Sequence, residues 1–195
     1  MKSIDVRFNQ EEISLIKNMV GTTLTKYKCD PFEFSTAVYG IVGICTDKSA
    51  YAFTNAIQVM DYYGADEDVA VFRLEKRANS EIESLISGNT MIELPVKKTI
   101  KEIDIINEHQ KVFENDKQTY DVWLTRGIIF RLEDDTEISL EKNVWFSEMI
   151  TVDKGNNLLS KFTPVEEFSE DWEGDFRGEC SRNVVRFSSC VNPST

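Results

Sequence analysis

The sequence predicts an α+β fold dominated by antiparallel β meanders and hairpins, with two short helices. Apolar and polar residues alternate in many short segments, which is the pattern of strands with one buried face. Clusters of turn-forming residues separate these segments at hairpin spacing. The 195 residues are 41% hydrophobic and 29% charged, a composition typical of globular rather than disordered chains. A chain of this length buries roughly 70% of its unfolded surface and needs no disulfide or metal to hold its core.

The first helix is predicted to begin at Asn9, after a short alternating strand. Glu12 stands three positions further on, where its carboxylate can complete a capping box with the Asn9 amide. Phe8 and Ile13 are spaced to pack on one another across this helix start. Gly21 suits the left-handed position that follows a helix end. These signals agree on one short helix near the N-terminus.

The second helix is predicted over residues 81–87. Ser80 and Glu83 have the spacing of a capping box, and Gly88 is placed to end the segment.

Two hairpins are predicted. The first joins residues 37–45 to 50–55. In the second, apolar side chains alternate over 128–132 and again over 138–140, which predicts one shared inward face, and residues 133–136 form the turn. The intervening side chains are expected to face water; they are Arg131, Glu133, Glu137, Ser139 and Glu141.

Pro95 lies within an alternating segment, which predicts an edge strand or a linker there. The chain is therefore divided into an N-terminal α+β subdomain, 1–92, and a C-terminal β-rich acidic subdomain, 93–195. Segments 40–55 and 127–143 align with one gap, which would make the two subdomains related β-rich units. The alternatives are a chance likeness between two hairpins and a single compact domain.

The four cysteines are Cys29, Cys45, Cys180 and Cys190. None stands in a C-x-x-C pair, so zinc-ribbon and thioredoxin-like motifs are absent from the sequence. The N-terminal residues lack the apolar stretch of an export signal, and no apolar run approaches the roughly 20 residues of a membrane helix. We therefore expect a cytoplasmic protein with reduced thiols. A bridge between Cys180 and Cys190 is the alternative.

His109 is the sole histidine, so any Ser-His-Asp, Cys-His or zinc site would have to use it. It stands in an alternating segment, which favours a surface strand residue. The sequence has no phosphate-binding glycine loop, dinucleotide fingerprint or nucleophile elbow. It therefore predicts no enzymatic activity, no catalytic residue, no cofactor and no metal. The alternative is a metal-dependent enzyme built on carboxylates.

The net charge of −12 argues against direct binding to nucleic-acid phosphates or anionic membranes. Segment 133–179 contains 14 acidic and four basic residues, so it holds most of the excess. Carboxylates clustered on stiff β-structure would imitate a row of phosphates and fit a partner groove rich in Arg and Lys. One alternative is a solubilising face. Another is a calcium-like arrangement of acids at Asp171, Glu173, Asp175 and Glu179.

The predicted partner-binding residues form two groups. The first is the tip of the second hairpin, and the second is an acidic segment around a tryptophan that would serve as an aromatic anchor. The residues are Glu133, Asp134, Asp135, Glu137, Glu166, Glu167, Glu170, Asp171, Trp172, Glu173, Asp175 and Glu179.

Segments 38–55, 60–75 and 122–150 resemble small acidic proteins of phages and mobile elements in Gram-positive bacteria, some of which are anti-CRISPR proteins that inhibit Cas9. The resemblance implies a protein that acts by stoichiometric binding, without chemistry. The expected partner is a CRISPR nuclease or its guide-RNA complex, whose PAM-reading arginines and positive channel suit an acidic DNA mimic. Binding to DNA alone or to membranes is not expected. The alternative is an acidic accessory or host-interaction protein of a mobile element, with no nucleic-acid enzyme as its target.

Overall fold

The computed structural model describes residues 1–32, 35–62, 64–170 and 172–189. Strands make up 61% of the described residues, and all but one of the strand pairings among them are antiparallel. The predicted β-rich fold with two short helices is confirmed, although the fold is more predominantly β than expected. The elements are β1 (Lys2–Val6), α1 (Gln10–Met19), β2 (Thr23–Cys29), β3 (Ala37–Tyr39), β4 (Ile41–Thr46), β5 (Ala50–Tyr62), β6 (Ala65–Arg77), η1 (Asn79–Glu81), β7 (Ile92–Glu114), β8 (Lys117–Leu132), β9 (Glu137–Lys142), β10 (Met149–Gly155), η2 (Leu158–Lys161), α2 (Glu167–Glu170) and β11 (Phe176–Ser188), where η marks a 3-10 turn.

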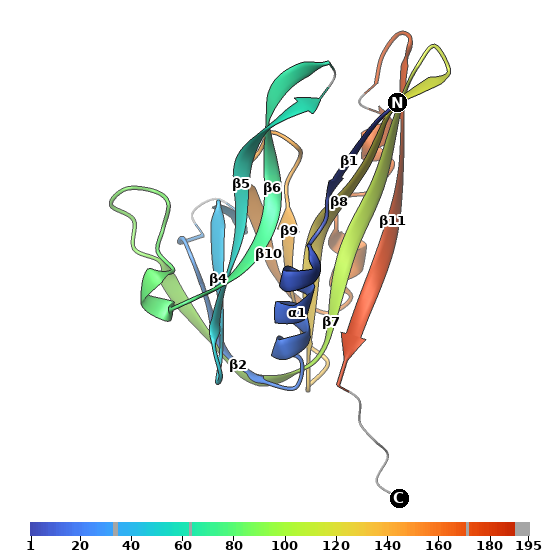
Figure 1. The fold of residues 1–195 in the computed structure, drawn as a ribbon. Coiled ribbons are helices and arrows are strands. Elements are labelled where there is room, and N and C mark those ends of the chain that lie inside the picture. The colour runs from blue at the N-terminus through green and yellow to red at the C-terminus, as the bar shows by residue number, and fades with distance from the viewer. Residues whose placement is uncertain (33–34, 63, 171, 190–195) are drawn as a thin grey trace, which may run out of the picture.

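One long strand, β7, joins the two halves of the sheet. Its residues 92–99 pair with β2, and its residues 100–114 pair with β8. From β2 the pairing continues through β4 and β5 to β6, and from β8 it continues through β9 and β10 to β3. β11 pairs antiparallel with β7, and β1 pairs parallel with β8. Figure 1 shows β4, β5 and β6 on one side of the molecule and β1, β7, β8 and β11 on the other.

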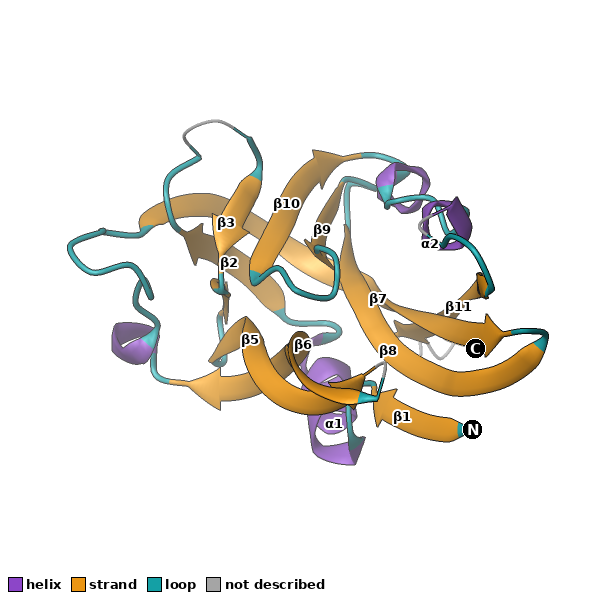
Figure 2. Cartoon of the chain, turned by 90° about the horizontal axis from the view of Figure 1, so that it is seen from above, coloured by secondary structure: helices purple, strands orange, loops and turns teal. Residues whose placement is uncertain are grey.

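The paired strands form a ring that the backbone itself closes, because β3 and β4 follow one another in the chain. Gly40 alone separates them, and its φ of +65° allows the bend between them. β3 pairs with β10, and β4 pairs with β2. Figure 2, which views the molecule from above, shows the resulting ring of strands.

The interior of this ring is apolar. In its main cluster the ring centroids of Phe53 and Phe72 lie 5.7 Å apart, and Phe130 meets Phe53 edge-on at 5.9 Å. α1 adds Ile16 and Met19, which are both fully buried. Burial of side chains of this size stabilises the fold by about 1.5–3 kcal/mol each. Segments from both halves of the sequence thus meet in one core.

The division of the chain into 1–92 and 93–195 stays a prediction. β7 begins at Ile92 and continues through the boundary without a break, and the main core cluster takes residues from both segments. The two predicted hairpins form as β4–β5 and β8–β9. A relationship between the two hairpins stays a prediction as well.

The first helix forms as predicted. Asn9 is its N-cap and accepts the N–H groups of Glu11 and Glu12 at 2.9 and 3.0 Å. The Glu12 carboxylate accepts the Asn9 N–H at 2.7 Å, which completes the capping box. Glu12 also accepts the Leu74 N–H at 2.9 Å, so the same carboxylate ties the helix start to β6. Gly21 follows the helix end with a φ of +78°.

The prediction of a helix over residues 81–87 is wrong. The structure has only the 3-10 turn η1 at the start of this segment, followed by bends and turns. Ile82 is fully buried, whereas Leu85 and Ile86 are exposed. The segment therefore has no apolar stripe for a helix to bury, and a helix this short is unstable without one. The second short helix is α2, which lies inside the acidic segment.

The β8–β9 hairpin has the predicted inward face, where Phe130 and Ile138 pair and are both fully buried. The opposite face was predicted to be exposed to solvent. This prediction is wrong for Glu137, Ser139 and Glu141, which are only 3%, 3% and 8% exposed. The turn η2 contacts β9 and β10 and packs its leucines against this side of the sheet. A second layer of chain therefore shields a face that alternation alone assigns to solvent.

Charged side chains on the shielded face are paired with one another. Asp104 is fully buried and accepts hydrogen bonds from Arg131 (3.0 Å) and Arg186 (2.6 Å). Burial acts to raise the pKa of Asp104, but the hydrogen bonds from the two arginines outweigh burial and lower that pKa below its ordinary value. This carboxylate therefore links β7 to β8 and to β11.

Within the described residues, no helix has the length and apolar character needed to cross a membrane. Cys29, Cys45 and Cys180 are free thiols, and Cys190 lies outside the described residues. Burial raises the pKa of Cys29 to about 11 and that of Cys180 to about 12, so both stay protonated near neutral pH.

Gly127 provides a test of how tightly the second layer packs. A Cβ at this position would lie 2.8 Å from the Phe162 ring and would collide with the Leu140 carbonyl oxygen, which is backbone and cannot rotate away. We expect Gly127→Ala to lower the free energy of unfolding by at least about 2 kcal/mol, measured by urea denaturation. Gly155→Ala is the matched control, because its Cβ meets its nearest neighbour at an ordinary 3.7 Å. Equal losses in the two variants would contradict this packing.

Candidate functional site

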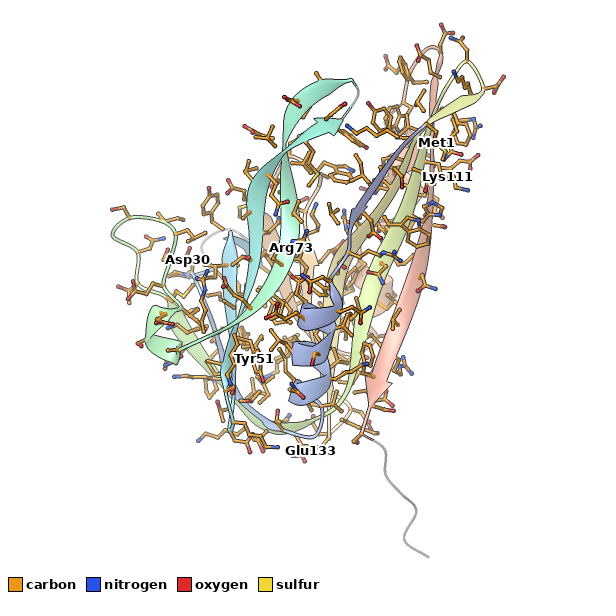
Figure 3. The ribbon with its side chains drawn as sticks, in the orientation of Figure 1. Met1, Asp30, Tyr51, Arg73, Lys111 and Glu133 are labelled. Carbon is orange, nitrogen blue, oxygen red and sulfur yellow. The ribbon has the colours of Figure 1, made fainter. Side chains whose placement is uncertain are left out.

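The acidic residues of the C-terminal segment do not form one surface. The Glu133 N–H donates to the Thr99 carbonyl at 3.0 Å. The Asn115 N–H donates to the Asp175 carbonyl at 2.9 Å, so the two predicted groups flank opposite ends of the part of β7 that pairs with β8, residues 100–114. A strand of the intervening length extends about 50 Å. Figure 3 shows Glu133 near one end of the molecule and Lys111 toward the other. The expectation of a single row of carboxylates is therefore wrong.

At the hairpin tip, lysines compensate the acids. Asp134 forms an ion pair with Lys98, and Asp135 forms one with Lys101 at 3.3 Å. The hydrogen bond from Lys98, with a further one from Thr136, lowers the pKa of Asp134 to about 2. The tip therefore offers less uncompensated negative charge than its sequence indicates.

Glu137 belongs to the interior of the hairpin. One carboxylate oxygen accepts a hydrogen bond from Arg131, and the other accepts the Leu158 N–H at 2.6 Å. Because both oxygens have partners within the chain and the residue is buried, we leave Glu137 out of the surface proposed below.

A cavity of about 1190 Å³ lies at the opposite end of the molecule. Its lining comes from the start of β1, the β5–β6 turn, the β7–β8 turn, residues 144–146 and the segment from Thr163 to Phe176, together with side chains of β7, β8 and β11. The hydrogen bond from the Gly64 N–H to the Tyr120 hydroxyl, at 2.6 Å, joins two of these segments. The fold thus assembles this cavity from parts of the sequence that are far apart.

Besides the buried Glu108, four carboxylates line the described cavity, and we call them the acidic rim: Asp61, Glu114, Glu167 and Glu173. Lys2 and Lys117 are the bases near them, and Lys2 pairs with Asp61 at 2.6 Å. That hydrogen bond lowers the pKa of Asp61. The adjacent turns add further acids that are exposed or half-buried, namely Asp66, Glu67, Asp68 and Asp116.

The rim includes some of the predicted binding residues and adds others. Glu167, Trp172 and Glu173 line the cavity. Asp61 and Glu114 were missed, because the sequence shows each only as an acid near a hairpin turn and the topology alone brings them together. The remaining predicted residues of this group lie on or beside the same segment: Glu166, Glu170 and Asp175 are exposed, Glu179 is exposed and paired with Arg177, and Asp171 lies outside the described residues.

Aromatic side chains form much of the cavity wall. Phe168 meets Trp172 edge-on with centroids 5.5 Å apart, and Trp172 lies 6.4 Å from Phe176. Gly178 allows this packing, because a Cβ there would collide with the Trp172 indole and would lie 2.9 Å from the Phe168 ring. Phe146 is 55% exposed at the same cavity. The wall therefore offers apolar surface that a binding partner could cover.

The deep part of the cavity is polar. The Trp145 indole donates to the Gln110 Oε1 at 2.8 Å, and the Gln110 amide donates to Glu108 at 3.2 Å. Glu108 also accepts a hydrogen bond from Arg182 at 2.6 Å. Nearby, Arg126 donates its Nε to Glu141 at 2.9 Å. These hydrogen bonds satisfy most of the buried polar atoms here, but among the described residues the Arg126 Nη2 and the Arg182 Nε have no partner.

His109 lies elsewhere, on β7. Its ring stacks on Trp123 with centroids 4.0 Å apart, and its Nε2 lies 2.8 Å from an Asp121 carboxylate oxygen. The predicted strand position is confirmed, and the side chain is half-buried. In the part of the chain that the structure describes, no group of three or more His, Cys, Asp or Glu residues is placed to hold a metal ion.

Comparisons with protein-family models, curated proteins and solved structures give no match to this chain.

Lys142 lies beside the cavity floor, and its burial predicts how the stability of the protein depends on pH. Burial, reinforced by the charge of Arg126, lowers its pKa from 10.5 to about 7, although Glu108 opposes the shift. Above pH 7 the unfolded chain therefore binds more protons than the folded chain, so the free energy of unfolding should rise with pH by up to about 1.4 kcal/mol per pH unit. Urea denaturation between about pH 7 and pH 8.5 measures this slope.

The matched variant is Lys142→Met, which keeps the apolar stem and removes the titrating group. In this variant, the free energy of unfolding should rise less steeply with pH than in wild type, because the titrating amine is absent. The variant should also be more stable than wild type near pH 7, because burial of a charge is costly. Parallel pH profiles for wild type and variant would show that Lys142 does not titrate in this range.

Proposed function

We propose that this chain is a non-enzymatic binding protein that engages a basic protein partner with the end of the molecule that carries the cavity. The observation that supports this best is the convergence of three acidic segments, from the β5–β6 turn, the β7–β8 turn and the segment before β11, around one aromatic-walled cavity. Following the sequence resemblance, we propose a CRISPR nuclease or its guide-RNA complex as the partner and inhibition of DNA binding or cleavage as the outcome.

Charge and apolar surface have separate parts in this proposal. The acidic rim and its neighbouring turns would attract Arg and Lys side chains, with which carboxylates form strong charge-assisted hydrogen bonds. Complementary charge accelerates association more than it strengthens a complex. Affinity requires buried anchors, and the exposed Phe146, Val144 and Phe176 stand at the cavity for that purpose.

The geometry changes the expected shape of the complex. A convex row of carboxylates would enter a basic groove of its partner. Here the acids surround a hollow, so the complementary surface is a protruding basic segment of the partner. Among the nuclease surfaces rich in arginine and lysine, we therefore favour a projecting loop over an open channel.

The test compares two triple variants with the same change in net charge. One reverses the cavity end, Glu114→Lys, Glu167→Lys and Glu173→Lys; the other reverses the hairpin tip, Glu133→Lys, Asp134→Lys and Asp135→Lys. All six positions are exposed. In a target-DNA cleavage assay with a Cas9–guide complex, we expect the first variant to lose at least tenfold in inhibitory potency and the second to stay within about twofold of wild type.

Equal loss in both variants would indicate a general charge effect and would contradict a defined binding end. Absence of inhibition by the wild-type chain would contradict the nuclease as partner and would favour the alternative of an accessory or host-interaction protein. Potency should also fall as salt is raised, because exposed charges more than about 8 Å apart are screened at physiological ionic strength.

A further inference from the structure

The floor of the cavity contains a cation that the chain itself leaves incompletely satisfied. Arg126 lines the cavity and is only 7% exposed. Its Nε donates to Glu141, but its buried Nη2 has no hydrogen-bond partner among the residues that the structure describes. A buried guanidinium N–H without an acceptor costs on the order of 1–3 kcal/mol. A second molecule that supplied an acceptor at this point would recover that free energy.

The acceptors close to Arg126 are already used. The Glu141 Oε1 that binds Arg126 also accepts the Thr163 N–H at 3.0 Å. The two oxygens of Glu108 accept hydrogen bonds from Arg182 and from Gln110. Among the described residues, the Glu141 Oε1 that binds Arg126 and both oxygens of Glu108 are therefore already engaged.

The charged side chains at the floor also include more basic than acidic groups. Arg126 and Arg182 are matched by Glu141 and Glu108. Lys142 adds a third basic group that is 3% exposed, and its Nζ donates to the Asn143 carbonyl at 3.2 Å and lies 5.3 Å from the centre of the Trp145 ring. Below about pH 7, where Lys142 is protonated, the described floor residues have one more positive charge than negative charge. An anion is therefore the group that fits it.

The side chains of the cavity wall indicate the chemical character of the rest of the ligand. Val112, Trp145, Val165, Phe168 and Trp172 also line the cavity. Typical small-molecule sites combine such apolar walls with a few polar groups that fix the orientation of the ligand. From the unpartnered Arg126 and the apolar walls, we infer that the cavity binds a small amphipathic carboxylate, with the carboxylate at Arg126 and the apolar body among the aromatic side chains.

Wild-type protein alone tests the inference. We expect decanoate to bind at least tenfold more tightly than 1-decanol, which has the same chain and no charge, because a hydrogen bond to a charged group contributes about 1.5–3 kcal/mol. Quenching of tryptophan fluorescence measures both affinities, since Trp145 and Trp172 stand in the wall. Salt at about 0.15 M limits repulsion of the anion by the acidic rim. Equal affinities, or no binding of decanoate, would overturn the inference.

Two variants locate the carboxylate. Arg126→Gln should remove the preference for decanoate over decanol. Arg177→Gln should retain it, because Arg177 is an exposed arginine of β11 that pairs with Glu179 and lies over the Phe113 ring. Retention of the preference in Arg126→Gln would contradict the assignment.

If Arg126→Gln does not fold, Phe146→Ala is the second variant, since Phe146 is exposed and its loss should weaken both ligands equally. Unchanged affinities in Phe146→Ala would contradict placement of the ligand in this cavity. The inference is independent of the proposed partner, because none of these ligand measurements contains a nuclease.

Discussion

The hydrogen-bond ladder along β7 is the constraint on which the rest of the structure depends. β7 pairs first with β2 and then with β8 and β11, so it holds both groups of strands in one ring. Its alternation sends Ile103 and Ile105 into the core and leaves Asp104 and Glu108 on the opposite face. The chain between β10 and β11 then covers that face, and burial of the carboxylates follows from this covering layer.

The covering layer determines both the ion pairs and the cavity. Ionised groups removed from water require partners, and Asp104 and Glu108 find theirs in Arg186 and Arg182 of β11. The layer packs tightly at Leu158 and Phe162 but stands away from the sheet further along, where the cavity lies. Arg126 stands in that second region with part of its hydrogen-bonding capacity unused. The proposed binding end and the ligand site are therefore consequences of one feature, a second layer that covers the sheet incompletely.

Local features of this fold could be predicted from the sequence, and long-range ones could not. The helix start at Asn9 and the inward face of the β8–β9 hairpin depend on neighbouring residues, and both predictions are confirmed. Glu137 was expected to face water because its hairpin was considered alone, whereas a segment later in the chain buries it. The acids of segment 133–179 are near one another in sequence, but the length of β7 separates them in space. Asp61 and Glu114 belong to the acidic rim because of how the strands pair, and the alternation of apolar and polar residues does not predict that pairing.

The central claim is that the end with the cavity, and not the hairpin tip, contacts the partner. Amide hydrogen exchange of the chain, alone and with a Cas9–guide complex, tests it most directly. The account predicts added protection in three segments that are distant in sequence, 61–68, 114–120 and 163–176, with residues 133–136 unchanged. Protection confined to 133–136, or spread evenly over the surface, would contradict it.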